Sequence, residues 1–445
     1  MNLSEIRLKE HLGIVTSDAS TVQFNFFVTP LRNKMSVRQG DYVMVDHPIF
    51  GERCPLLAEV KEIKNYEEVV GTTLTEKSIE TMATGEIIGY VDLREPQARP
   101  LHELFAPPTP GSKVYLPYFE FLEDVFVRDA DGRLFPHALH VGDLETFANS
   151  QEGAVKPLRF YLNAEDFKWQ HLLITAISGV GKTHTATVIA EELANKTDSP
   201  LVILDAHGEY TTLGIAGTRF TQLATEGDLS ANDYPFDFSV TMYACDCERV
   251  RDTLARSGVA VEKKGRFNVK PVAGRWTQTS DEAAERTMTE GLRKDVRSKQ
   301  VTILDSHGLS PDEKRCLYTG CVKALWNGRV DGSVGPFVLV VEEAETLETE
   351  TLERVASEGR RVGLSLCLLT QHPTAMSDTV LSQMGAQMMG RTTDARDLEY
   401  LRNMAMEKVA VLPKLTTGEW IINGITMRRP TKVLARDRYS VECHA

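Results

Sequence analysis

Hydrophobic positions divide the chain into two parts with different patterns. Before residue 100, short apolar and β-branched runs alternate with turn residues, as in VQFNFFV (22–28), YVMVDHP (42–48), PLLAEVKEI (55–63) and GEIIGYVDL (85–93). Several short strands at this spacing are typical of a small barrel or sandwich. We therefore expect a small β-rich domain over residues 1–100.

A proline-rich stretch follows this first part. The segment ARPLHELFAPPTPGSKVYLP (98–117) contains prolines that oppose regular helix, so it should be extended and loop-like. We interpret residues 101–165 as a connector region between two larger parts of the chain.

The pattern changes from about residue 166, where continuous apolar runs alternate with helical segments. The runs are LLITA (172–176), LVILD (201–205), VTILD (301–305), FVLVV (337–341) and LSLCLLT (364–370). Such runs are typical of strands buried on both faces in a parallel sheet that helices cover. We expect an α/β domain with a mainly parallel sheet over residues 166–445. The charged, helix-rich section at about 223–300 indicates a helical insertion between two strands.

The strongest motif in the chain is AISGVGKT (176–183), which has the spacing of a phosphate-binding loop. A buried strand enters it and a predicted helix, 183–196, leaves it. Two glycines allow a tight turn whose N–H groups bind phosphate oxygens, lysine neutralises phosphate charge and threonine can ligate Mg²⁺. ATP is therefore the expected ligand. The candidate binding residues are Ser178, Gly179, Val180, Gly181, Lys182, Thr183 and His184.

An acidic strand end complements this loop. FVLVV runs directly into Glu342 and Glu343. We expect Glu342, with Thr183, to hold Mg²⁺, and Glu343 to orient and deprotonate the attacking water. The strand candidates 201–205 and 301–305 lie between the loop and this strand in the sequence, which agrees with a RecA-like sheet and opposes the simplest kinase order.

Two further polar strand ends supply candidates. Gln371 follows the run 364–370 and can sense the γ-phosphate or the attacking water, or it can simply satisfy backbone groups. Asp205 and Glu209 lie in DAHGEY (205–210), at the edge where α/β sheets place ligands. Glu209 is a candidate for water activation or for coupling to a neighbouring subunit, and a capped turn at Gly208 is the alternative.

Charge and cysteine content narrow the class of protein. Lys and Arg total 50 against 63 Asp and Glu, a net charge of −13, so a surface that is basic throughout is excluded. Any nucleic-acid site must be a local patch or a pore. The seven cysteines form no CxxC pair, which favours reduced thiols in a cytoplasmic protein. No apolar run is long enough to span a membrane.

The motifs together resemble the HerA-type hexameric DNA translocases of the HerA/FtsK branch of RecA-like ATPases. The resemblance rests on AISGVGKT, LDAHGEY, VVEEAE, SEGRRVG, LLTQHP, LSQMGAQMMGR and LPKLTTGEW and covers nearly the whole chain. It implies that the N-terminal strands form a small β-barrel. The chain departs from the family pattern at Ala176, Ala206, Glu342 and Glu345.

The resemblance also implies a ring of six subunits with ATP between neighbours. Arg360 matches the family position of an arginine that completes the next subunit's site, with Arg361 and Arg391 as alternatives. Double-stranded DNA is the implied partner. Basic clusters at 261–276, 293–299 and 428–438 are candidates for phosphate contact, and each can equally be a solvated face.

Four functions compete at this point. The first is an ATP-driven double-stranded DNA translocase or helicase that works with a nuclease, in the family often NurA, in DNA end processing. The second is the same ring as motor or scaffold of an anti-phage defence complex with a sirtuin-like or nuclease effector. A secretion or conjugation pump is opposed by the lack of a membrane segment, and a non-motor assembly protein is opposed by Glu343 and Arg360.

Overall fold

The computed structural model describes residues 7–29, 37–68, 78–94, 101–129, 131–144, 157–168, 170–217, 236–259, 266–272, 282–424 and 430–442. Contacts divide the chain into two units. The first comprises Met1–Phe135 and Asp143–Tyr161, and the second comprises Pro136–Gly142 and Leu162–Ala445. The domain limits expected at residues 100 and 165 stay predictions.

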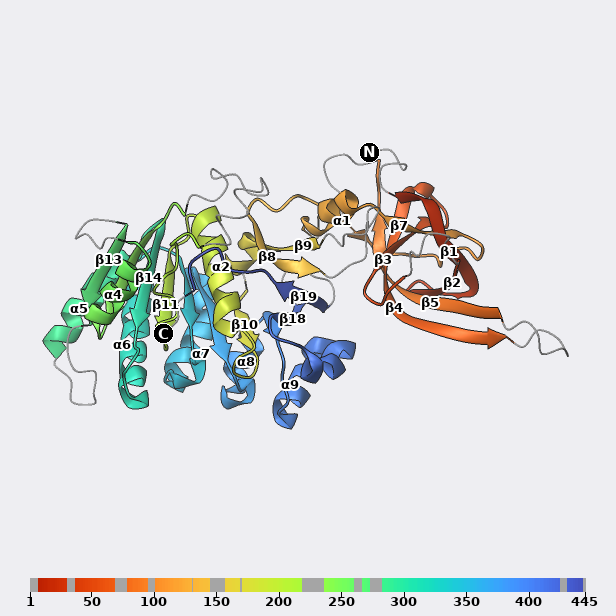
Figure 1. Ribbon diagram of the computed structural model, residues 1–445. Coiled ribbons are helices and arrows are strands. Elements are labelled where there is room, and N and C mark those ends of the chain that lie inside the picture. The colour runs from red at the N-terminus through yellow and green to blue at the C-terminus, as the bar shows by residue number, and fades with distance from the viewer. Residues whose placement is uncertain are drawn as a thin grey trace. The chain divides into compact units, whose positions relative to one another are not determined.

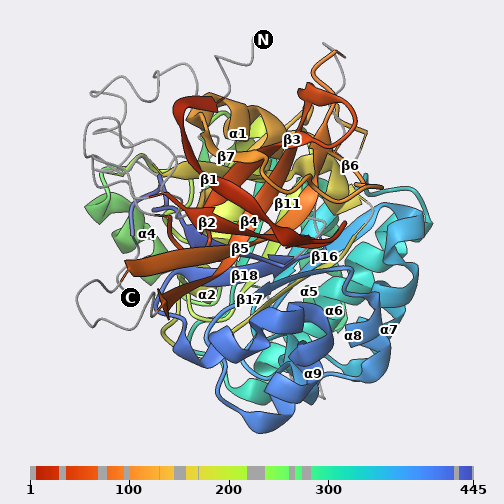
Figure 2. The same ribbon diagram turned by 90° about the vertical axis from the view of Figure 1, so that its right-hand side faces the viewer.

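The first unit is built on a closed antiparallel barrel (Figure 1 and Figure 2). Its strands pair in the order β2-β1-β7-β3-β4-β5-β6, and an additional pairing of β2 with β5 closes the barrel. The predicted barrel is therefore confirmed. The strands are β1 (Arg7–Ala19), β2 (Gln23–Val28), β3 (Tyr42–His47), β4 (Gly51–Glu68), β5 (Ser78–Val91), β6 (Leu101–His102) and β7 (Lys113–Pro117).

Alternating side chains of these strands fill the barrel interior. Phe24 and Phe26 are fully buried at alternate positions of β2, as the period of a half-buried strand requires. The sequence pattern missed β1, whose first half is charged, and it assigned β7 to a connector. Tertiary pairing decides both, because β7 lies between β1 and β3. The helix α1 (Phe119–Phe126) follows β7.

A large, mainly parallel sheet lies mostly in the second unit, although residues 143–144 of β8 and 158–161 of β9 are assigned to the first. Its order is β13-β12-β14-β11-β15-β16-β10-β17-β18-β19-β8-β9, and the strands from β13 to β17 are parallel. The strands are β8 (Ala138–Leu144), β9 (Leu158–Asn163), β10 (Leu172–Thr175), β11 (Leu201–Asp205), β12 (Ser239–Ala244), β13 (Phe267–Pro271), β14 (Gln300–Asp305), β15 (Phe337–Val341), β16 (Leu364–Thr370), β17 (Ala386–Met389), β18 (Glu419–Asn423) and β19 (Thr431–Ala435).

The order of the central strands is that of a RecA-like sheet. One strand, β16, separates the phosphate-loop strand β10 from the acidic strand β15. The sequence interpretation took 201–205 and 301–305 as the strands between the two. In the structure these are β11 and β14, which lie on the far side of β15, so the separating strand is one that comes later in the chain. The predicted fold class is confirmed, but the strand between β10 and β15 is β16 and not one of the two strands that the sequence suggested.

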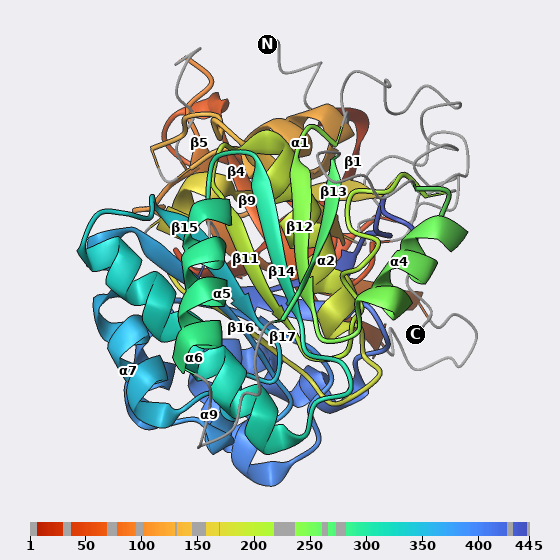
Figure 3. The ribbon, with the colours of Figure 1, turned by 90° about the vertical axis from the view of Figure 1, so that its left-hand side faces the viewer.

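Helices cover both faces of this sheet. Figure 3 shows α5, α6 and α7 on one face and α2 and α4 on the other. The helices are α2 (Lys182–Lys196), α4 (Cys247–Arg256), α5 (Glu282–Asp295), α6 (Pro311–Val330), α7 (Thr349–Glu358), α8 (Asp378–Gln383) and α9 (Ala395–Ala405). Short 3-10 turns are η2 (Ala164–Lys168), η3 (Ala344–Thr346), η4 (Gly359–Val362), η5 (Pro373–Ala375) and η6 (Met406–Lys414). No helix in the described ranges is long and apolar enough to cross a membrane.

Local sequence accounts for several helix starts. Ser310 and Glu313 form a capping box at α6, with Pro311 at the first helical position. Asp246 caps α4 by accepting the Arg249 N–H. These caps satisfy N–H groups that the helices themselves leave unpaired.

The region expected to be a helical insertion contributes strands as well. Its described part holds α4 and α5, but also β12 and β13, which extend the parallel sheet beyond β14. The run SVTMYA (239–244) is almost entirely buried, as β-branched and apolar residues in a sheet strand should be. Its short length made it inconspicuous within a charged segment.

Candidate nucleotide-binding site

The phosphate loop lies between β10 and the start of α2. Gly179 and Gly181 have φ angles of 76° and 103°, in the left-handed region that favours glycine. Because α2 begins at Lys182, its first N–H groups point into the loop. Ala176 does not need positive φ, and a Cβ placed on Gly390 would lie 2.8 Å from the Ala176 Cβ. The glycine opposite therefore makes room for alanine in the loop.

A cavity of about 470 Å³ opens beside this loop. It joins the loop to residues from the ends of β11, β15 and β16. Its lining residues are Ser178, Gly179, Gly181, Lys182, Thr183, His184, His207, Glu209, Glu342, Glu343, Glu345, Leu369, Thr370, Gln371 and Thr417. The structure thus brings together residues that are up to 239 positions apart in the chain, counted from Ser178 to Thr417.

Lys182 folds back onto the loop that precedes it. Its Nζ donates to the carbonyl oxygens of Ala176, at 2.8 Å, and Ile177, at 3.1 Å. Burial lowers the pKa of Lys182, while the nearby carboxylates of Glu345 and Glu342 act in the opposite direction. A bound phosphate would therefore compete with these carbonyl oxygens and carboxylates for the Lys182 amine.

Glu342 and Thr183 form a close contact across the cavity. The Thr183 Oγ1 donates to Glu342 Oε1 at 2.7 Å, and the Ala206 N–H donates to Oε2 at 3.1 Å. The Glu342 side chain is almost fully buried, and this burial raises its pKa, with the Asp205 charge adding to the effect. The two predicted metal-ligating oxygens are therefore adjacent.

Glu343 has an unusual backbone conformation. Its φ is 49°, in a region that residues other than glycine rarely adopt and that is common at functional sites. Its Oε1 lies 3.2 Å from His207 Nε2, and its Oε2 lies 3.8 Å from Lys314 Nζ. The hydrogen bond from His207 lowers the pKa of Glu343, and the same contact raises the pKa of His207. The carboxylate is thus held between two basic groups.

The loop after β11 is shaped by one buried carboxylate. Asp205 accepts N–H groups from His207 (3.1 Å), Gly208 (2.7 Å), Glu209 (3.2 Å) and Tyr210 (3.1 Å). This is the capped turn at Gly208 that the sequence analysis gave as the alternative to a functional role for Glu209. The turn also directs Glu209 and His207 to the cavity, and the catalytic or coupling role of Glu209 stays a prediction.

The remaining loop candidates and Gln371 lie in or beside the cavity. Gln371, Ser178 and His184 line it, and the His184 ring also contacts the Arg436 carbonyl oxygen at 3.0 Å. Val180 is buried beside the loop and is absent from the cavity lining within the described residues. Its carbonyl oxygen accepts from the Gly418 N–H, so Val180 supports the loop from behind.

The arginines lie outside this chain's own cavity. Arg360 is exposed on η4, where its Nη2 donates to Gln383 Oε1 at 3.0 Å, and Arg361 is exposed beside it. Arg391 follows β17, and its carbonyl oxygen accepts from the Ile177 N–H of the phosphate loop at 2.9 Å. Arg360 and Arg361 do not line this cavity, so a role for either in completing a neighbouring subunit's site stays a prediction, whereas Arg391 adjoins the site of its own chain.

Sequence reasoning missed several residues of the site. His207, Glu345 and Thr417 line the cavity but were not proposed as site residues. Thr417 and Gly418 belong to the turn before β18, and the Gly418 N–H donates to the Val180 carbonyl oxygen at 3.0 Å. The sequence did offer a signal for these residues, because they lie in the motifs LDAHGEY, VVEEAE and LPKLTTGEW. The motifs alone did not indicate which of their residues line the cavity.

Some basic residues of the clusters proposed for DNA contact are bonded within the fold. Arg436 and Arg438 are buried, the first against Glu191 and Glu192 and the second against Thr212. This excludes both from a DNA-facing surface, which corrects the interpretation of 428–438.

The other two clusters are also partly engaged. Arg293 donates to the Ala324 carbonyl oxygen and Lys299 to that of Asn195, while Arg266 donates to the Phe238 carbonyl oxygen. Positions 261–265, 273–276 and 428–429 of the three clusters lie outside the described residues.

Comparisons with known proteins agree with this site. A family model described as the central domain of helicase HerA matches residues 139–258. A probable helicase of Methanocaldococcus jannaschii is 22% identical over 90% of this chain and 86% of its own length. The DNA double-strand break repair helicase HerA of Pyrococcus furiosus is 20% identical over 96% of this chain and 92% of its own length.

Among solved structures, VirB4 of Thermoanaerobacter pseudethanolicus is 12% identical, with a TM-score of 0.36 over 68% of this chain and 96% of that one. The family model and the relatives match the part of the chain that carries the phosphate loop, and the relatives extend over nearly all of it. These similarities to HerA-type helicases agree with the resemblance that the motifs of the chain indicate.

Proposed function

We propose that this protein is an ATP-driven, double-stranded DNA translocase or helicase. The observation that carries the proposal is one cavity that joins the phosphate loop to Glu342, Glu343 and Gln371, which come from the ends of two different strands. This combination supports hydrolysis, because binding of phosphate alone needs no pair of carboxylates and no polar residue at the adjacent strand end.

Each residue has a role in the proposed reaction. The loop N–H groups and Lys182 bind the phosphate oxygens of ATP and offset their charge. Glu343 orients a water molecule and accepts its proton as that water attacks the γ-phosphorus. Gln371, at the end of β16, lines the same cavity, and we propose that it contacts the γ-phosphate or the water. Glu209 lines the same cavity and is proposed to assist in water activation.

Mg²⁺ is the proposed metal of this site. Thr183 Oγ1 and Glu342 Oε1 are 2.7 Å apart and both residues border the cavity, and hard oxygen ligands of this kind suit Mg²⁺. The ion would neutralise charge on the phosphate oxygens. Few protein ligands suffice, because Mg²⁺ in such sites keeps waters and phosphate oxygens in its shell.

The first test replaces Glu343 with glutamine. Glu343→Gln keeps the size of the side chain but removes its ability to accept a proton. We expect ATP binding to persist and steady-state hydrolysis to fall by roughly 100-fold or more. Fluorescent-nucleotide binding and phosphate release measure the two steps.

The matched control is Glu350→Gln, an exposed glutamate in the first turn of α7. It removes one carboxylate from the same region and should leave hydrolysis unchanged. Wild-type turnover in Glu343→Gln would assign the water-activating role to another residue.

Action on DNA is supported by the similarity to a repair helicase over nearly the whole chain. We expect duplex DNA to stimulate hydrolysis, and the stimulation to weaken as salt rises, because phosphate contacts release counterions. ATP-dependent displacement of a third strand from a triplex reports movement along the duplex. Absence of both stimulation and displacement would contradict the DNA part of the proposal.

The proposal includes a ring of six subunits in the cytoplasm that works with a nuclease in DNA end processing. The same ring in an anti-phage defence complex is the alternative. Mass measurement with and without ATP and DNA tests the ring. A pull-down of native partners separates a nuclease of the NurA kind from a sirtuin-like effector.

A further inference from the structure

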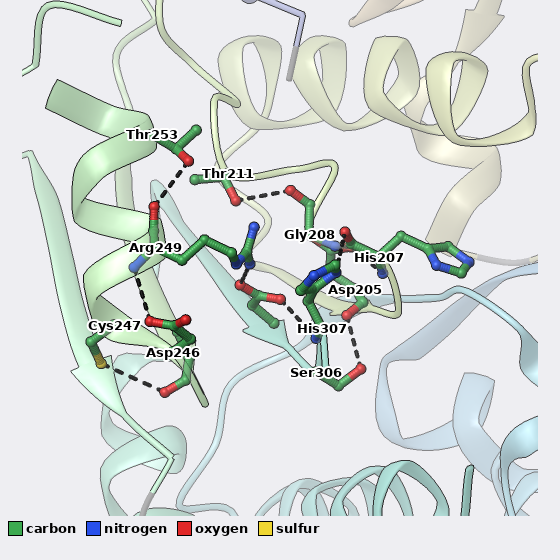
Figure 4. Close-up of polar contacts among 12 residues, drawn as sticks. Asp205, His207, Gly208, Thr211, Asp246, Cys247, Arg249, Thr253, Ser306 and His307 are labelled. Atoms are coloured by element: carbon green, nitrogen blue, oxygen red, sulfur yellow. Dashed lines mark hydrogen bonds and ion pairs between the residues drawn. The ribbon is translucent and has the colours of Figure 1, made fainter. Parts of the chain in front are cut away.

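A helix outside the cavity makes a specific contact with the loop that reaches Glu343. Arg249 lies on α4, and Asp246 and Thr253 fix its backbone by hydrogen bonds of 2.9 Å each. Its side chain extends toward the loop after β11 (Figure 4). Arg249 does not line the cavity, so any effect on the reaction must pass through other residues.

The Arg249 guanidinium has two neighbours. Its Nη2 donates to Asp305 Oδ2, and the Asp305 side chain is only 3% exposed. A Cβ built on Gly208 would lie 2.8 Å from both Nη1 and Nη2. The guanidinium therefore packs directly against the backbone of the loop, at a glycine with φ of 79° that leaves room for it.

Asp305 belongs to the same sheet edge as the loop. It pairs in register with Asp205 across β14 and β11, so two buried carboxylates stand side by side. The Arg249 charge offsets this like-charge pair, which would otherwise be costly. Asp305 Oδ1 also accepts the His307 N–H at 3.0 Å.

His307 and Ser306 then hold the loop from the β14 side. The Ser306 Oγ donates to the Asp205 carbonyl oxygen at 3.0 Å, and His307 Nδ1 lies 3.2 Å from the His207 carbonyl oxygen. The backbone of His207 is thus bound on two sides, while its ring reaches Glu343 Oε1 at 3.2 Å.

We propose that Arg249 is a positioning residue for ATP hydrolysis, which acts through Asp305 and the loop 205–210 to hold His207 against Glu343. The inference rests on the proposed function, since it assigns a role in the same reaction. If the inference is right, a displacement of α4 changes the rate of hydrolysis although α4 does not line the cavity.

The test compares Arg249→Ala with Arg249→Lys and with Arg251→Ala, a control on an exposed position of the same helix. For Arg249→Ala we expect kcat to fall roughly 10- to 100-fold with KM for ATP within about twofold, because a small misplacement affects the reacting geometry more than binding. Arg249→Lys keeps a charge for Asp305 and should give an intermediate kcat. Arg251→Ala should match the wild type.

A double variant tests the route through His207. If Arg249 acts through His207, adding Arg249→Ala to His207→Ala should lower kcat little further. The inference would be overturned if the fold-losses of kcat in the two single variants multiplied in the double variant, or if Arg249→Ala left kcat unchanged. Arg249→Lys supplies the same readout where the alanine variant fails to fold.

Wild-type hydrolysis is measured beside Lys182→Ala as a reference. If the wild type shows no hydrolysis that depends on Lys182, the proposed function is wrong and this inference falls with it. If that hydrolysis is present and Arg249→Ala keeps its kcat, only this inference is wrong.

Discussion

His171 illustrates at the residue scale how a buried titratable group is held in one state. Its Nε2 lies 3.0 Å from the Ala356 carbonyl oxygen, and its Nδ1 accepts the Leu366 N–H at 3.0 Å. These two contacts require the neutral ring with the proton on Nε2. Burial lowers the pKa of His171 from 6.5 to about 4.

This shift predicts a dependence of stability on pH. Between pH 4 and 6.5 the unfolded chain binds a proton at His171 that the folded chain excludes. The stability that the buried neutral ring contributes to the folded state is therefore fully present above pH 6.5 and is lost as the pH falls toward 4. The full effect is about 3 kcal/mol. Denaturant unfolding at about pH 7.5 and about pH 5 should show this loss in the wild type and a smaller one in His171→Gln. Equal pH slopes in both would contradict the assignment.

At the scale of elements, the phosphate-loop helix is tied to the segment after β19 by buried charges. Arg436 Nη2 lies 3.3 Å from Glu191 and 2.8 Å from Glu192, and all three side chains are at most 5% exposed. Glu191 also accepts the N–H groups of Tyr439 and Ser440. The position of α2 therefore depends on a part of the chain 245 residues away, as the Glu191–Arg436 separation gives.

Removing the central cation of this network should be costly. Arg436→Met removes the buried cation that Glu191 and Glu192 share, although Lys196 stays 2.9 Å from Glu192. We expect the free energy of unfolding to fall by about 3–5 kcal/mol. Lys432→Met, which breaks the more exposed pair with Glu419, should cost at most about 1 kcal/mol. Denaturant unfolding measures both. Similar costs for the two variants would mean that burial of the network adds little.

At the scale of the whole molecule, the exposed position of Arg360 bears on the proposed ring. Arg360→Ala should keep ATP binding and lose about three decades of hydrolysis, as loss of an arginine at a transferring phosphoryl group does. Mixing it with Lys182→Ala should restore part of the activity, because some interfaces then combine an intact Lys182 with an intact Arg360. Lack of rescue would count against action between subunits, and the same loss in Arg361→Ala would favour that neighbour.

Local sequence was sufficient for the parts of the protein that depend on short-range rules. Glycine at 179 and 181 is needed for positive φ, and apolar runs that end in Glu342 or precede Gln371 indicate buried strands with polar ends. These rules predicted the phosphate loop, the acidic strand and a β-rich first part of the chain, whereas the barrel itself followed from the resemblance to the HerA-type family.

Only the tertiary structure decided which of these pieces meet. Strand order placed β16 between β10 and β15, brought His207 to Glu343 and brought Thr417 to the phosphate loop. It also turned Arg436 and Arg438 from a basic cluster into buried partners of the fold. The physical reason is that local periodicity depends on neighbouring residues, whereas strand order and the burial of a charge depend on partners that are distant in the chain.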